Sequence, residues 1–161
     1  MHSPRRIRSA FSLIELVIVV VIIGIIAAIA IPRMSRGAAG AGDSALTGDL
    51  AVMRKAIDLY AAEHGGSFPS ATDITTQLTQ YTDGSTGAGQ ASKDATHIYG
   101  PYLQKIPSLP VGANKNSNTI LTSGTPGAAA GGWLYTAATG TIQANCPDTE
   151  KDAAGTKYNS Y

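Results

Sequence analysis

One apolar run constrains this chain more than any other feature of its sequence. Residues 11–31 carry a single charge, Glu15, and three arginines stand among the ten residues before them. At a rise of about 1.5 Å per residue, a helix of this length spans about 31 Å, the thickness of the hydrocarbon core of a bilayer. A lone strand cannot satisfy its backbone hydrogen bonds in lipid, so the run predicts one membrane-spanning helix.

The charges beside the run predict its orientation. Because basic residues stay on the cytoplasmic side, the arginines place the N-terminus in the cytoplasm and the chain after Pro32 on the other side of the membrane. A cleaved secretory signal is the alternative, since residues 28–30 read Ala-Ile-Ala, a cleavage site of the A-x-A type. Such signals have a shorter apolar region, of roughly 7 to 15 residues, and cleavage there would discard Glu15.

Glu15 is the residue in this run that needs an explanation. A carboxylate costs roughly 2.5–3.5 kcal/mol at the middle of a membrane and less near its edge, so an acid in a spanning segment predicts a functional partner. The alternative is a side chain that only extends to the lipid headgroups.

The residues around Glu15 resemble a known family. The stretch SAFSLIE at residues 9–15 follows the arginines, and the apolar run stops at Pro32. This pattern resembles the class III leader and N-terminal helix of type IV pilins and type II secretion pseudopilins. The resemblance implies that a prepilin peptidase cuts between Ala10 and Phe11 and methylates the new amino group. The family usually has glycine before the cut, where this chain has Ala10.

The same residues suggest how copies of the chain assemble. Cleavage before Phe11 creates an α-amino group one helical turn from Glu15. In a bundle of such helices, the ammonium of one copy can meet the Glu15 carboxylate of a neighbour that is shifted by about one turn. This head-to-tail pairing does not close on itself, so it predicts a helical fibre.

The end of the apolar run carries two residues that disturb helices. Glycine weakens a helix and proline removes a hydrogen bond, so we expect a bent or locally melted stretch between Gly24 and Pro32. The family resemblance implies the same loosening when subunits leave the bilayer. The alternative is that Pro32 only ends the membrane helix.

A second helical pattern follows. Apolar side chains recur at spacings of three and four residues at Leu46, Leu50, Met53, Ile57 and Tyr60. Two glycines at positions 65 and 66 predict the end of this helix. We therefore predict one long interrupted helix from about residue 13 to about residue 64, whose apolar stripe needs a cover.

The rest of the chain predicts a small α+β head with a thin core, because Gly, Ser, Thr, Asn and Ala dominate it. We expect a short helix at residues 73–81, a polar loop at 83–92, a helical turn at 101–106, a strand at 119–122, and a hairpin of residues 133–135 and 141–144. An antiparallel sheet packed on the apolar stripe would bury both. The predicted division is a cleaved leader (1–10), a membrane or filament-core helix (11–32), an amphipathic helix (33–65) and the head (66–161).

Two further features help to choose among relatives. A looser resemblance to the globular part of G-type major pseudopilins rests on Tyr102, Leu103, Pro107, Pro110, Trp133 and Tyr135. Cys146 alone cannot form the C-terminal disulfide loop of many type IV pilins within the chain, which favours a pseudopilin or a disulfide-free pilin. The G-type resemblance also implies a calcium site, for which Asp148, Glu150 and Asp152 offer oxygen ligands. Ordinary solvated acids are the alternative.

Composition and motifs argue against other classes of function. The net charge is +1, and loss of the leader arginines leaves nine basic and eleven acidic side chains, so no basic patch predicts nucleic-acid binding. His64, His97 and Cys146 occur without a catalytic or metal-binding motif, so we predict no enzyme. His64 is expected as a cation at a helix end, and Trp133 as part of the core.

These features together predict a structural subunit of a helical pseudopilus or pilus-like filament at the bacterial inner membrane. The expected role is the type II secretion piston, and the alternative is a surface type IV pilin for adhesion, motility or DNA uptake. A monomeric, membrane-anchored binding module is a second class. The expected partners are other copies of the chain, a prepilin peptidase, an inner-membrane assembly platform, and minor pilins or pseudopilins. No cofactor other than calcium is expected.

Overall fold

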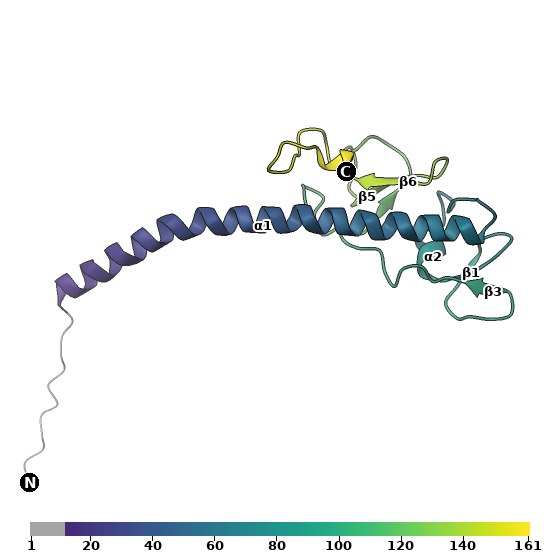
Figure 1. The fold of residues 1–161 in the computed structure, drawn as a ribbon, viewed down its shortest axis with the longest axis horizontal. Coiled ribbons are helices and arrows are strands. Elements are labelled where there is room, and N and C mark those ends of the chain that lie inside the picture. Colours follow the sequence, from purple (N-terminus) through teal and green to yellow (C-terminus); the bar gives the residue numbers. More distant parts are fainter. Residues whose placement is uncertain (1–11) are drawn as a thin grey trace, which may run out of the picture. The chain divides into compact units, whose positions relative to one another are not determined.

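A computed structural model of the chain describes residues 12–161, without the side chains of residues 31–38. The chain divides into two compact units, Met1–Ala38 and Ala39–Tyr161. The elements, in chain order, are α1 (Leu13–Glu63), α2 (Ile74–Thr79), β1 (Tyr81–Asp83), β2 (Gly89–Gln90), β3 (His97–Tyr99), β4 (Ile120–Leu121), β5 (Trp133–Thr136), β6 (Thr141–Ala144) and the 3-10 helix η1 (Tyr158–Ser160). Figure 1 shows them along the chain. The α+β class with an N-terminal hydrophobic helix is confirmed.

The helix α1 is continuous over 51 residues. It runs through Gly24 and Pro32, so the local melting expected between these residues is absent from this structure. The physical reason is that proline removes only the hydrogen bond of its own missing N–H, while long helical stretches on both sides keep theirs. Loosening of this stretch inside a filament stays a prediction.

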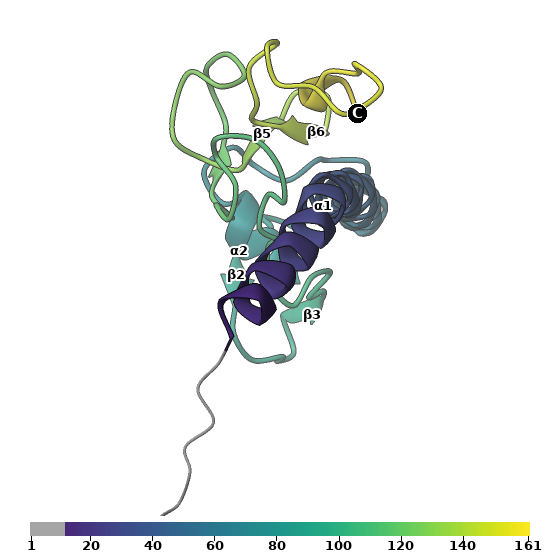
Figure 2. The ribbon, with the colours of Figure 1, turned by 90° about the vertical axis from the view of Figure 1, so that its left-hand side faces the viewer.

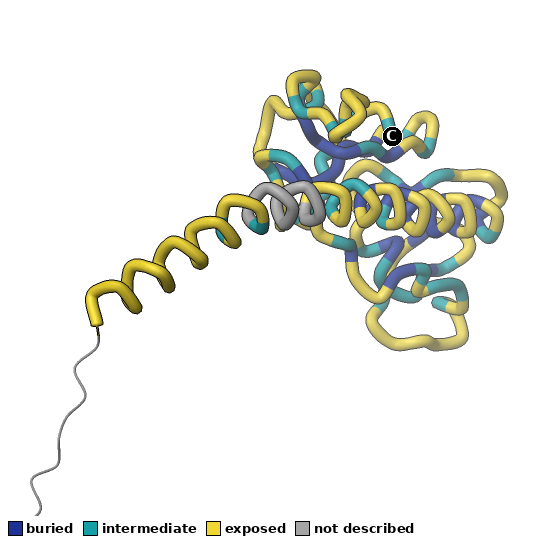
Figure 3. Tube along the Cα trace, turned by 60° about the vertical axis from the view of Figure 1, so that its left-hand side comes forward, coloured by how far each residue is buried: buried dark blue, intermediate teal, exposed yellow. Residues whose placement is uncertain are grey.

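The second half of α1 carries the predicted apolar stripe. Its five members are at most 3% exposed: Leu46, Leu50, Met53, Ile57 and Tyr60. Figure 3 draws buried residues in dark blue, along the second half of α1 and in the segments of the head. The helix ends where the sequence predicted, since Gly65 and Gly66 take φ values of +62° and +88° and the Gly66 N–H donates to the Ala61 carbonyl at 2.7 Å.

One three-stranded sheet has the order β4-β5-β6. The predicted hairpin is confirmed, because β5 and β6 pair antiparallel with Tyr135 opposite Ile142. The all-antiparallel expectation is wrong for the third strand, since β4 pairs parallel to β5, with Ile120 opposite Trp133. A parallel neighbour is possible because a long crossover separates β4 from β5.

The aromatic residues of β5 fix this sheet in the core. Trp133 and Tyr135 are 0% and 1% exposed, and the polar group of each donates a hydrogen bond to a backbone carbonyl. The Trp133 indole N–H donates to Pro107 at 2.8 Å, and the Tyr135 hydroxyl donates to Pro69 at 2.9 Å. Both side chains belong to the same apolar cluster as the α1 stripe, so the predicted packing of the sheet on this helix and the core position of Trp133 are confirmed.

A second sheet, with the order β2-β1-β3, was not predicted. Its strands have two or three residues each and show no alternation of apolar and polar side chains. The strand β2 lies inside the segment that was expected to be only a polar loop. Figures 1 and 2 show the β5–β6 hairpin and the β1–β3 strands on different sides of the second half of α1.

The helical turn expected at residues 101–106 is wrong. The segment is irregular, and the N–H groups of Tyr102 and Leu103 both donate to the carbonyl of Leu78, at 3.0 and 2.9 Å. These backbone groups satisfy the free end of α2 instead of closing a turn of their own. Leu103 and Ile106 are still buried in the core, 8% and 5% exposed.

Candidate functional site

The predicted membrane segment is an apolar helix whose side chains are exposed in the part of the chain that the structure describes. The window Leu13–Ala30 of α1 has a mean hydropathy of 3.2 and is long and apolar enough to cross a membrane. None of its residues is buried, and Figure 3 shows the helix in yellow, the colour of exposed residues, over almost all of this length. Exposure of Val, Ile and Leu side chains around a whole helix is favourable only against lipid or other apolar helices.

Glu15 lies in the first turn of this helix. Its Oε2 accepts a hydrogen bond from the backbone N–H of Ser12 at 2.9 Å, and the Leu16 N–H donates to the Ser12 carbonyl at 3.2 Å. The carboxylate therefore satisfies one of the four N–H groups that a helix leaves free at its start. A negative charge is also favourable there because of the helix dipole.

This contact gives Glu15 a local role that the sequence interpretation missed. Ser12-Leu-Ile-Glu15 has the S-x-x-E spacing of a capping box, in which the acid three residues after the N-cap binds the N-cap amide. The motif could have been found from the sequence. Ala10 and Phe11, the predicted cleavage and methylation residues, lie outside the described residues, so the Glu15–Phe11 pairing is not tested.

Gly24 and Pro32 complete the predicted residues of this helix. Among the described residues, no atom lies within 4 Å of a methyl group placed at Gly24. Pro32 lies within α1. A small residue in a membrane segment allows a neighbouring helix to approach closely.

The C-terminal loop contains the three predicted calcium ligands, and two of them have separate partners. Asp148 accepts hydrogen bonds from the Lys157 ammonium and from the Asn159 amide, the latter at 2.9 Å, and the Lys157 contact is the main cause that lowers its pKa. Asp152 accepts from the Tyr161 hydroxyl, which is the main cause that lowers its pKa, and from two backbone N–H groups of its own turn at 2.8 Å.

Glu150 connects this loop to the body of the head. Its Oε1 accepts a hydrogen bond from the Ala113 N–H at 2.8 Å. Its Oε2 is buried and has no hydrogen-bond partner within the described part of the chain. Over residues 12–161, apart from the undescribed side chains, no group of three or more His, Cys, Asp or Glu side chains is placed to hold a metal ion. Calcium at Asp148, Glu150 and Asp152 stays a prediction.

Cys146 is a buried free thiol next to Glu150. Burial and the neighbouring Glu150 carboxylate raise its pKa to about 12. A thiol with this pKa carries almost no thiolate at neutral pH, so Cys146 is not arranged as a nucleophile.

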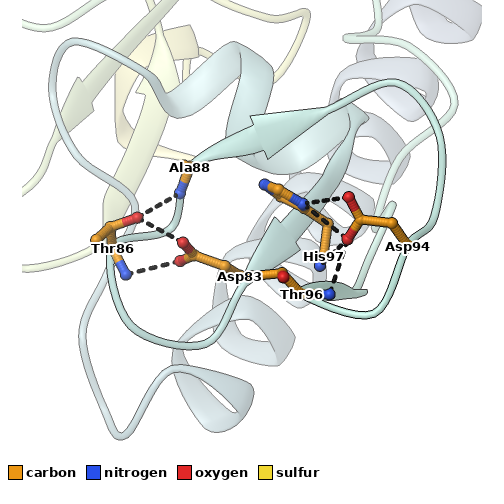
Figure 4. Close-up of polar contacts among 6 residues, drawn as sticks. All are labelled: Asp83, Thr86, Ala88, Asp94, Thr96 and His97. Carbon is orange, nitrogen blue, oxygen red and sulfur yellow. Dashed lines mark hydrogen bonds and ion pairs between the residues drawn. The ribbon is translucent and has the colours of Figure 1, made fainter.

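The β1–β2 turn and the loop before β3 are fixed by two aspartates (Figure 4). Asp83 accepts from the hydroxyl and the N–H of Thr86, both at 2.7 Å, and these bonds lower its pKa to about 2. Asp94 accepts from the His97 N–H at 2.7 Å and also contacts the His97 ring at 3.0 Å, and its pKa is also lowered to about 2. These carboxylates stabilise turns by accepting hydrogen bonds from nearby backbone N–H groups, as aspartate commonly does in loops.

The comparisons with known proteins agree with the N-terminal geometry. Residues 5–31 match the family model of the prokaryotic N-terminal methylation motif. No curated protein and no solved structure matches the chain. The motif supports a type IV pilin-like structural subunit with a class III leader, processing by a prepilin peptidase and one N-terminal membrane anchor.

Proposed function

We propose that this chain is the repeating subunit of a helical filament at the bacterial inner membrane, and that the filament is a type II secretion pseudopilus. The observation that carries the proposal is Glu15, a carboxylate in the first turn of an exposed apolar helix, inside a methylation motif. An acid at this place has an energetic cost in lipid that a charged neighbour can remove.

The assembly step follows from where the new amino group would appear. After cleavage between Ala10 and Phe11, a methylated ammonium stands about one helical turn before Glu15. Methylation keeps the positive charge, and a neighbour shifted by about one turn brings its own Glu15 against it. Each subunit then offers one cation and one anion to two different neighbours, so growth continues as a fibre.

The proposed filament could act in secretion or at the cell surface, and the secretion role is the one proposed here. The family resemblance implies that a cytoplasmic ATPase drives growth of a short periplasmic piston that moves folded proteins through an outer-membrane secretin. The alternative is a surface type IV pilin for adhesion, motility or DNA uptake. Long fibres in sheared culture supernatants support the surface pilus, and short fibres that stay with the cells support the pseudopilus.

The most direct test combines two measurements on the native filament. Mass spectrometry of the mature chain should find a methylated Phe11 at the N-terminus, and electron microscopy should find helical fibres of this subunit. A mature chain that begins at Ile31 would support the secretory signal instead. A processed chain that remains monomeric in the membrane would support the anchored binding module.

We also propose calcium as a ligand of the C-terminal loop, with Asp148, Glu150 and Asp152 as oxygen donors. Calcium must displace the Lys157 ammonium from Asp148, so Lys157→Ala should strengthen binding. Isothermal titration of the wild-type chain and this variant measures the effect. Absence of calcium binding in both proteins would contradict this site.

A further inference from the structure

His64 is held between the end of α1 and the strand β1. It is the first residue after the helix and is 9% exposed. Its Nδ1 lies 2.8 Å from the Tyr60 carbonyl oxygen, and its Nε2 lies 2.9 Å from the Asp83 carbonyl oxygen. Both ring nitrogens therefore contact backbone atoms that can only accept a hydrogen bond.

The chemistry of imidazole makes this geometry depend on protonation. A neutral ring has one N–H and one lone pair, so it can donate to only one of the two carbonyls. The imidazolium has two N–H groups and donates to both. A lone pair facing a carbonyl oxygen at less than 3 Å is repulsive, so the neutral ring must lose one of these contacts.

The neutral ring has a second partner already in place. The Thr82 hydroxyl lies 3.2 Å from His64 Nε2, and Thr82 is 0% exposed. A hydroxyl can donate as well as accept. With the proton on Nδ1, the ring still donates to Tyr60, while Nε2 accepts from Thr82 and no longer binds Asp83.

Two aromatic rings and the C-terminal end of α1 surround the His64 ring. The His64 ring stacks on the Tyr60 ring, with 3.8 Å between centroids and 6° between planes, and Tyr99 of β3 lies 5.4 Å away. Aromatic faces attract cations, and the C-terminal end of a helix carries a partial negative charge.

Other charged and titratable groups lie on the elements around His64. On α1, the Glu63 carboxylate accepts from the Tyr102 hydroxyl at 2.6 Å. On β1, the Asp83 carboxylate is bound by its own turn, and Asp83 pairs in register with His97 of β3. The His97 ring itself contacts the Asp94 carboxylate at 3.0 Å.

We propose that His64 is a proton-dependent latch that joins the end of α1 to β1. In the protonated state its Nε2–H holds the Asp83 carbonyl and with it the β1–β2 turn. In the neutral state Nε2 exchanges this contact for the Thr82 hydroxyl and releases Asp83. The end of α1 is therefore joined to β1 more firmly at acidic than at alkaline pH, independently of whether the chain forms a filament.

The first test is NMR on the full chain in detergent micelles, with ¹⁵N-labelled histidine, between about pH 5.5 and about pH 8.5, where histidines change charge. His64 should show two ring N–H groups at the acidic end and only Nδ1–H at the alkaline end. The amide signals of Asp83 and of the turn after it should shift over the same pH range. A ring that is neutral at the acidic end, or still doubly protonated at the alkaline end, would overturn the latch.

The second test uses thermal unfolding of Thr82→Val, which removes the donor to the neutral ring. The substitution should lower the Tm relative to the wild type at both pH values, and by about 3–6 °C more at about pH 8.5 than at about pH 5.5. This additional decrease is the effect of one hydrogen bond. An equal loss at both pH values would contradict the exchange of partners. His97→Gln is the matched control, and it should leave the pH dependence of the His64 signals unchanged.

Discussion

Glu15 accepts one hydrogen bond from a described residue of its own chain and is proposed to pair with a neighbour in the filament, and two substitutions separate these two contacts. Glu15→Gln keeps an oxygen that can accept the Ser12 N–H, because glutamine also serves at this position of a capping box. It removes the charge that the neighbour's ammonium would meet. Glu15→Ala removes both the cap and the charge.

The two contacts differ in magnitude. Loss of a helix cap costs about 0.5–2 kcal/mol. Removing one member of a buried ion pair costs about 3–5 kcal/mol, because the other charge is left without a partner. At about 1.4 kcal/mol per factor of ten, the second effect weakens association of a subunit by about 100- to 4,000-fold. Glu15→Gln should therefore prevent filament assembly nearly as completely as Glu15→Ala does.

The assay compares filament yield from cells that produce each variant as their only source of this subunit. Filaments are sheared and sedimented, and mass spectrometry of the membrane fraction confirms that each variant is cleaved before Phe11. Asp49→Asn is the matched control, since it removes a negative charge from the second half of the same helix, outside the apolar window. Filaments of Glu15→Gln at wild-type yield would refute the ion pair and leave Glu15 as a helix cap.

Three further predictions concern the head. Met53→Ala should lower the free energy of unfolding by about 2–5 kcal/mol in chemical denaturation, because Met53 is 0% exposed, whereas Leu59→Ala on the exposed face should change it by less than about 0.5 kcal/mol; equal losses would contradict the assignment of the buried face. The pKa of Asp83 is lowered to about 2, so its contribution to stability is present above its unfolded value of about 3.9 and is lost as the pH falls from about 4 to about 2. Asp83→Asn should therefore be less stable than the wild type at neutral pH, with a difference that shrinks over this range in acid unfolding curves. Cys146 should resist maleimide at about pH 8 in the folded chain and react after unfolding, since burial raises its pKa to about 12; rapid labelling of the folded chain would show that the thiol is accessible.

The parts of the fold that the sequence predicted are those with a clear periodicity. The stripe from Leu46 to Tyr60 repeats every three to four residues, and the helix has a glycine stop, so its buried face and its end could both be located. The hairpin has aromatic residues in β5 and β-branched residues in β6, on the two sides of a turn that contains Gly140, whose φ is +67°.

The parts that the sequence did not predict depend on contacts between distant segments. The strands β1 to β3 are too short to produce a pattern, and they form because Asp83 and Asp94 fix the loops around them. The carbonyl of Leu78 that binds Tyr102 and Leu103 cannot be located from local propensity either. At the N-terminus, the S-x-x-E spacing of Ser12 and Glu15 is a local signal for the helix cap that the structure shows.

The two halves of α1 bury their apolar surface against different partners. In Leu13–Ala30 no residue is buried by the chain, so the gain from removing this apolar surface from water must come from lipid or from other subunits. In the second half, the five side chains of the apolar stripe are buried within the head itself. Substitutions in the first segment should therefore change insertion and assembly but not unfolding of the head, and substitutions in the stripe should do the reverse. The effects of one substitution from each set should add in a double variant.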